Sequence, residues 1–149
     1  AMVSKLRAST KKILEPAMAK EGFSIRYPHF QRKRNGRLEL VNLEHDKWGG
    51  GFFLEFAERD AGDLQTSWGE IVPEAKIDVA YTDPGARARL LATTIPSSSP
   101  KDYFRYDSFA DDRERCDALI EELVSLLPQV LRWFESGVVG PNVAPFSDS

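Results

Sequence analysis

The sequence is poor in cysteine, histidine and long apolar runs: it has one cysteine and two histidines in 149 residues, and no apolar run exceeds three residues. A single cysteine excludes an internal disulfide and is typical of a reducing compartment. An apolar run such as Phe52-Phe53-Leu54 is too short to cross a bilayer. No basic start followed by an apolar stretch is present. We therefore expect a cytoplasmic protein without a secretory signal or a membrane span.

Motifs for phosphate binding and nucleophilic catalysis are also missing. The chain has no Gly-Lys-Ser/Thr loop and no Gly-x-Ser-x-Gly elbow, and Gly49-Gly50-Gly51 does not have dinucleotide-binding spacing. We interpret these glycines as a flexible or close-approach loop. Cys116 falls on the apolar face of a predicted helix, which is typical of a buried core residue and not of a nucleophile. We therefore expect no enzyme activity, no cofactor and no metal.

What the chain does have is an ordinary globular composition and an uneven charge. Hydrophobic residues make up 42% and charged residues 29%, and the length suits one domain. Residues 1–37 carry ten lysines and arginines against two glutamates (net +8), whereas residues 38–149 carry ten against 21 acids (net −11). This asymmetry indicates either two surfaces for different partners, or two segments that lie side by side and neutralise each other.

Hydrophobic periodicity predicts a helix near each end of the chain. Apolar residues in 4–20 recur at helical spacing, and Pro16 within this segment predicts a kink or a break. A longer amphipathic pattern over 116–134 predicts a second helix, kinked at Pro128 and ended by Gly137.

The segments between the helices predict strands. Asn35-Gly36 predicts a tight hairpin turn between strands over 30–34 and 37–43, because both residues tolerate positive φ. Further strands are expected over 52–57, 76–81, 87–94 and 102–109. The expected fold is α+β, with a mostly antiparallel sheet of four to six strands between an N-terminal helix and a long C-terminal helix. We expect a single domain over 4–137 and a loosely ordered tail over 138–149.

Two polar clusters suggest chemistry of a specific kind. Glu44-His45-Asp46, alone or with His29 across the hairpin, is the only cluster in the sequence with metal-ligand types, and a solvated polar loop is the simpler interpretation. The basic hairpin residues Arg32, Lys33, Arg34 and Arg37 offer contacts for phosphate, but a charged edge that resists sheet pairing explains them better. Nucleic-acid binding is accordingly a minor alternative.

Surplus aromatic residues favour recognition of another protein. Trp48, Trp68, Tyr103, Tyr106 and Trp133 are more than so small a sheet needs for its core, unless most of them cover its ends. Tryptophan, tyrosine and arginine are enriched at interface hot spots.

Several of these segments together resemble the bacterial domain-of-unknown-function family 4304. The matching features are Leu14-Glu15-Pro16, Glu21-Gly22-Phe23, Phe30-Gln31-Arg32, Val41-Asn42-Leu43 followed by Lys47-Trp48, the 52–56 strand, Arg87-Ala88-Arg89-Leu90 and the final helix. The likeness covers about residues 4–135, and Glu44 departs from the glutamine that the family tends to have there. The resemblance implies an α+β fold but no established activity and no catalytic residues. Small acidic proteins of such families resemble immunity proteins, which neutralise toxins.

We therefore expect a protein-binding module, most concretely an immunity protein that occludes the active site of a basic toxin. The expected partner-binding residues are Glu44, Asp46, Trp48, Glu55, Tyr103 and Tyr106. The alternative is a small-ligand-binding or hydrolytic domain that uses Glu44-His45-Asp46 with Arg87 and Arg89, since arginines on a strand can clamp an anion. The oligomeric state and the partner's identity do not follow from the sequence.

Overall fold

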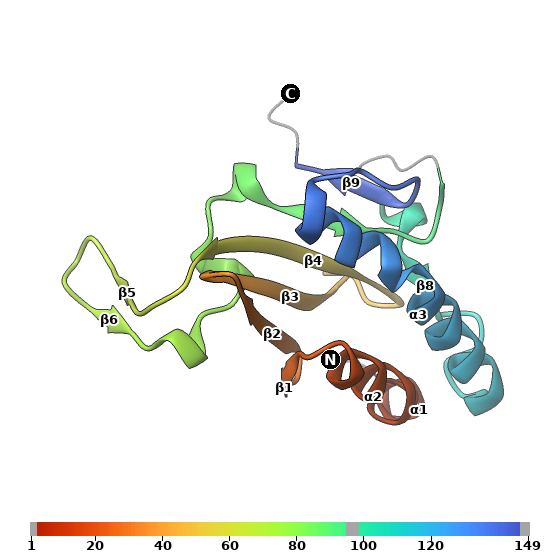
Figure 1. The fold of residues 1–149 in the computed structure, drawn as a ribbon. Helices are drawn as coiled ribbons and strands as arrows, with labels where there is room; N and C mark the ends of the chain where they lie inside the picture. Colours follow the sequence, from red (N-terminus) through yellow and green to blue (C-terminus); the bar gives the residue numbers. More distant parts are fainter. Residues whose placement is uncertain (1–2, 95–98, 147–149) are drawn as a thin grey trace.

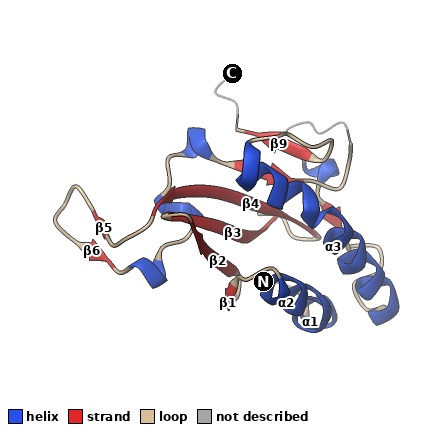
Figure 2. Cartoon of the chain, in the orientation of Figure 1, coloured by secondary structure: helices blue, strands red, loops and turns tan. Residues whose placement is uncertain are grey.

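A seven-stranded antiparallel sheet forms the centre of the computed structural model, which describes residues 3–94 and 99–146 (Figure 1, Figure 2). The strands, in their order across the sheet, are β1 (Ser24–Arg26), β2 (His29–Arg34), β3 (Arg37–His45), β4 (Gly51–Asp60), β7 (Ala88–Leu90) and β9 (Val143–Pro145), and β8 (Phe104–Arg105) also pairs with β4. The predicted α+β class is confirmed, and the sheet has one strand more than the expected four to six.

The hairpin between β2 and β3 forms at the predicted turn. Asn35 and Gly36 have φ values of 52° and 74°, and Arg34 pairs with Arg37 across the turn. Both turn positions need positive φ to follow the twist of the strands, which explains the Asn-Gly pair. This turn fixes the register of all six residue pairs between the two strands.

The N-terminal helix contains a π turn where the sequence predicts a kink or a break. It consists of α1 (Ser4–Ser9), the π-helical turn η1 (Thr10–Leu14) and α2 (Glu15–Lys20). Pro16 has no N–H to donate to the carbonyl of Lys12, and its ring crowds that carbonyl, so a wider turn relieves both problems.

The C-terminal helix α3 (Arg113–Ser136) begins and ends as the sequence predicts. The Asp112 side chain accepts from the Arg115 N–H at 3.1 Å, and Gly137 closes the helix in the left-handed region with φ 70°. The helix continues through Pro128 as one element. Cys116 is fully buried on its inner face, and this burial raises the pKa of the thiol, so the predicted core role is confirmed.

The main hydrophobic core lies between the helices and one face of the sheet, which we call the helix face. Its largest fully buried members include Phe30, Phe52, Phe56 and Phe104, and α3 lies across this face in Figure 1. A smaller core of Leu38, Leu40, Ala57, Val72, Ile77 and Val79 lies on the opposite face. We call that opposite face the open face, because short segments cover only part of it.

The covering segments contain turns of 3-10 helix where the sequence predicts a strand. They are η2 (Glu74–Lys76) and η3 (Val79–Tyr81), and they follow a ribbon formed by β5 (Leu64–Gln65) and β6 (Ile71–Val72) that extends away from the sheet in Figure 1. The prediction of a strand over 76–81 is wrong, because the Asp78 side chain accepts from the Ala80 N–H at 2.8 Å and starts a turn. Two further 3-10 turns, η4 (Pro84–Ala86) and η5 (Pro100–Asp102), lie on either side of β7, and the strands predicted over 87–94 and 102–109 shrink to β7 and β8.

The prediction of a loosely ordered tail is wrong for residues 138–146. Strand β9 pairs with β7, and Asn142 before it is 3% exposed. The Asn142 N–H donates to Gln129 Oε1 at 2.9 Å, and the Asn142 Nδ2 donates to the Leu91 carbonyl at 3.0 Å. Partners far away in the sequence therefore order this segment, and residues 147–149 of the predicted tail lie outside the described part.

The two oppositely charged segments neutralise each other within the fold. Arg32 and Arg34 form ion pairs with the buried Glu39, and Lys33 pairs with Glu74 at 3.4 Å. Arg37 likewise pairs with Glu58 and Asp60. The ion pairs support the second of the two interpretations of the charge asymmetry.

Candidate functional site

Five polar residues form a continuous row across the open face of the sheet. They are Arg26, His29, Asn42, Glu55 and Arg89, each the direct cross-strand partner of the next, on β1, β2, β3, β4 and β7. Residues in register on neighbouring strands project to the same face. We call this set the polar row.

At the middle of the polar row, an amide and a carboxylate hold the imidazole of His29. Asn42 Oδ1 accepts from the Val79 N–H at 3.4 Å and lies 3.0 Å from His29 Nδ1, so Nδ1 carries a hydrogen. The Asn42 Nδ2 points to Glu44 Oε1 and Asp78 Oδ1 at 3.3 and 3.4 Å. His29 Nε2 faces Asp78 Oδ2 at 3.7 Å. Both ring nitrogens thus face an oxygen, which fixes the orientation of the ring.

At the β7 end of the polar row, one carboxylate holds two arginines. Glu55 lies 3.3 Å from Arg89 Nε and 3.8 Å from Arg87 Nη1. The Arg89 guanidinium also lies 4.4 Å from the ring centre of Phe53, and the half-buried Tyr103 packs on the same ring at 4.8 Å. Arg87 and Arg89 therefore meet Glu55 and not the Glu44-His45-Asp46 cluster of the alternative hypothesis. Glu55 has a structural role here, while Arg89 and Tyr103 reach the surface.

Hydrogen bonds and an ion pair hold the loop between β3 and β4, and this loop exposes Trp48 to solvent. Asp46 Oδ1 accepts from the Trp48 N–H at 3.0 Å, and Asp46 Oδ2 binds Arg105 Nη1 at 2.7 Å. Both contacts lower the pKa of Asp46, the bond from the Trp48 N–H most strongly. Arg105 also donates to the Gly49 carbonyl at 3.3 Å. Asp46 is 8% exposed, whereas Trp48 is 82% exposed.

Arg105 explains the run of glycines in this loop. Added Cβ atoms at Gly50 and at Gly51 would each lie 2.8 Å from a nitrogen of the Arg105 guanidinium, and Gly49 and Gly50 have φ values of 83° and 79°. The loop is therefore of the close-approach type, one of the two interpretations that the sequence allows.

Two of the residues expected in functional roles lie on the helix face. Tyr106 is 3% exposed and packs 6.4 Å from Phe52, and burial raises the pKa of its phenol. As a correction, Tyr106 belongs to the core and not to a partner surface. His45 also points to the helix face, opposite Phe52, and burial lowers the pKa of its imidazole.

The residues of the metal interpretation do not converge in this geometry. Residues Glu44 and His45 are neighbours in β3 and project to opposite faces, and His29 shares the open face with Glu44. Within residues 3–94 and 99–146, no group of three or more histidine, cysteine or acidic residues is arranged to hold a metal ion. The residues of the alternative ligand-binding or hydrolytic hypothesis are also separated, with Arg87 and Arg89 at Glu55 and His45 on the helix face.

Sequence reasoning missed Arg26, Asn42 and Asp78. Asn42 carries a usable signal, because a two-residue turn at 35–36 pairs residue 29 with residue 42 and so places the histidine opposite an amide. Asp78 reaches His29 across a separation that no local pattern in the sequence specifies. At its β7 end the site holds its charged groups in internal pairs, and it presents aromatic and arginine side chains to solvent.

Fold and site together define a small α+β domain with one helix-covered face and one partly open, polar face of its sheet. A family profile, Domain of unknown function (DUF4304), matches residues 14–136, and the chain belongs to this family. No curated protein matches, and no solved structure does either. In the part of the chain that the structure describes, every helix is too short or too polar to span a membrane.

Proposed function

We propose that this protein is a non-catalytic binding module, and that it acts as an immunity protein by covering the active site of a toxin. The observation that carries the proposal is the exposure of Trp48 on a hydrogen-bonded loop. A tryptophan that is 82% exposed has about 150–250 Å² of surface to offer to a partner. Burial of that surface is a large favourable contribution to binding.

The fastening of the loop supports this role. The Asp46 carboxylate, the Arg105 guanidinium and the Gly49 carbonyl hold the backbone on both sides of Trp48. Ordering a loop on binding costs free energy, and a loop that is ordered beforehand avoids this cost. In this proposal Asp46 positions Trp48 and does not itself contact the partner.

The surroundings of Trp48 have the composition of an interface. The half-buried Glu44 and Tyr103 lie toward the same end of the sheet, since β3 ends at His45 and β8 pairs with the start of β4. Arg89, stacked on Phe53, extends the surface along the open face. Arginine, tyrosine and tryptophan are the residue types that dominate binding energy at interfaces. The whole chain keeps a net charge of −3, which a basic partner would complement.

The test is co-expression with any toxin-like protein that is found to be encoded beside the gene in its host. We expect the chain to restore growth and to bind that protein, and we expect Trp48→Ala to weaken binding at least tenfold. Trp68→Ala is the matched control, because Trp68 is 72% exposed but lies on the β5–β6 ribbon at the other end of β4. Absence of growth rescue together with no binding tighter than millimolar contradicts the proposal.

A further inference from the structure

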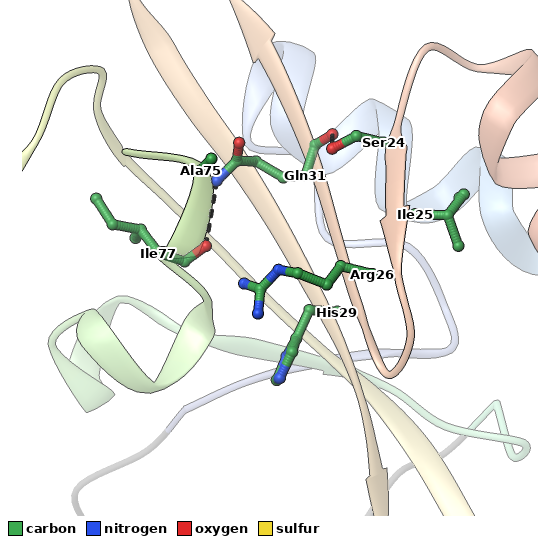
Figure 3. Close-up of a pocket in the computed structure, with 7 residues that line it drawn as sticks. All are labelled: Ser24, Ile25, Arg26, His29, Gln31, Ala75 and Ile77. Carbon is green, nitrogen blue, oxygen red and sulfur yellow. Dashed lines mark hydrogen bonds between the residues drawn. The ribbon is translucent and has the colours of Figure 1, made fainter. Parts of the chain in front are cut away.

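A groove on the open face lies between the β1–β2 hairpin and residues 75–77. It has a volume of about 220 Å³ and is lined by Ser24, Ile25, Arg26, His29, Gln31, Ala75 and Ile77 (Figure 3). A metabolite-sized ligand fits, whereas typical drug-sized ligands need about 300 Å³ or more.

The walls of the groove are fixed by hydrogen bonds. The Gln31 side chain donates to the Glu74 carbonyl at 2.8 Å and to the Ile77 carbonyl at 3.2 Å, which ties β2 to the far wall. Figure 3 shows the second of these bonds across the groove. The Ser24 hydroxyl donates to the Gln31 carbonyl at 3.1 Å and ties β1 to β2. The groove therefore exists before any ligand enters.

The guanidinium of Arg26 extends into this groove without a counter-ion. Figure 3 shows it reaching toward the segment that carries Ile77, beside the ring of His29, its direct cross-strand partner. Among residues 3–94 and 99–146, Arg26 forms no ion pair. This contrasts with Arg87 and Arg89 at the other end of the polar row, which share Glu55.

The nearby carboxylates are already occupied. Glu74 accepts from the Gly62 N–H with one oxygen and pairs with Lys33 through the other. Asp78 accepts from the Ala80 N–H at 2.8 Å with Oδ1, and its Oδ2 faces His29. Arg26 is left as a guanidinium with five N–H donors, beside His29, whose Nδ1–H is already directed at Asn42 Oδ1. An unpaired guanidinium matches the oxygen atoms of a carboxylate or a phosphate.

We propose that this groove binds a small organic anion, whose carboxylate or phosphate group pairs with Arg26 beside His29. The backbone of residues 75–77 bounds the ligand and limits its size. The groove uses different residues from the Trp48 surface, so the two proposals succeed or fail independently.

The experiment is an NMR titration of the full chain at constant ionic strength, with inorganic phosphate in one arm and acetate in the other. We expect one of the two anions to bind with a Kd in the millimolar range and to shift signals of residues 24–31 and 75–77. Saturation by phosphate alone identifies a phosphate ligand, and saturation by acetate identifies a carboxylate. No saturable shift with either anion overturns the proposal.

Variants of Arg26 separate specific binding from general attraction to positive charge. Arg26→Ala is expected to weaken binding about tenfold or more, since a hydrogen bond to a charged group is lost, and Arg26→Lys is expected to restore part of it. Arg132→Ala is the control, because Arg132 is an exposed arginine on α3. Equal binding by the native chain and Arg26→Ala contradicts the assignment.

Discussion

Removal of the Glu39 carboxylate tests how the fold holds its charge in the interior. Glu39 is 2% exposed and lies 2.6 Å from Arg32 Nε and 2.9 Å from Arg34 Nη2. Breaking a buried ion pair by removing one partner costs about 3–5 kcal/mol, because the other charge stays buried without compensation. When Glu39 is removed, the Arg34 side chain, which is 35% exposed, is still largely hydrated. The Arg32 side chain is only 11% exposed, so the burial of its charge determines the cost.

Arg32 keeps some compensation in the variant, which sets the magnitude near the lower end of this range. Its Nη1 still donates to the Glu21 carbonyl at 2.8 Å, and its guanidinium still lies 4.7 Å from the centre of the Phe23 ring. Its Nη2 is already buried without a partner. We expect Glu39→Ala to lower the free energy of unfolding by about 3 kcal/mol. At this chain length that corresponds to a fall in Tm of about 6–12 °C.

Urea unfolding followed by tryptophan fluorescence measures this cost. The control is Glu58→Ala at the cross-strand neighbour of Glu39, because Glu58 is 33% exposed and pairs with Arg37 at 3.4 Å. An exposed pair of this kind contributes less than about 1 kcal/mol. A double-mutant cycle of Glu39→Ala with Arg32→Ala is expected to give a coupling of about 2 kcal/mol. The reasoning is refuted if Glu39→Ala costs no more than Glu58→Ala, or if the coupling is zero.

Three further predictions concern the end of the sheet that carries the Trp48 loop. Gly51→Ala is expected to destabilise the protein by about 1 kcal/mol by displacing the Arg105 guanidinium. In thermal unfolding, the double variant Gly51→Ala with Arg105→Ala should lose less stability than the two single variants lose in sum. The native chain should lose stability as the pH falls below about 6.5, because burial lowers the pKa of His45 and the unfolded chain therefore takes up the proton first. His45→Leu should remove this loss. Urea unfolding midpoints measured above and below about pH 6.5 check the prediction. Asp46→Asn should make the stability depend less on pH below about pH 4. The pKa of Asp46 is lower in the native state than in the unfolded chain, so the ionised carboxylate stabilises the native state at pH values above the unfolded-state pKa, and this stabilisation is lost as the pH falls. An unchanged dependence of stability on pH below about pH 4 contradicts the prediction.

The elements that the sequence predicts correctly depend on neighbours a few residues away. The helix that ends at Gly137 follows from apolar spacing and a residue that tolerates positive φ, and the β2–β3 hairpin follows from Asn35-Gly36. The register of that hairpin places His29 opposite Asn42, so part of the polar row can also be predicted from the sequence. These features are local because helix periodicity and turn geometry act over a few residues.

The candidate sites required partners that are distant in the chain. The six residues expected to bind a partner divide in the structure into a displayed Trp48, a positioning Asp46, a structural Glu55, a core Tyr106, and the half-buried Glu44 and Tyr103. Composition identifies an acid or an aromatic side chain, but only the fold decides whether an arginine or a helix covers it.

The sequence by itself determined the α+β class, a helix toward each end, the central hairpin and a buried Cys116. The tertiary structure decided which acids neutralise which bases, why residues 76–81 form turns of 3-10 helix, and why residues 143–145 add a strand to the sheet. Short segments such as these gain little free energy from their own local contacts, so long-range hydrogen bonds and burial select their conformation.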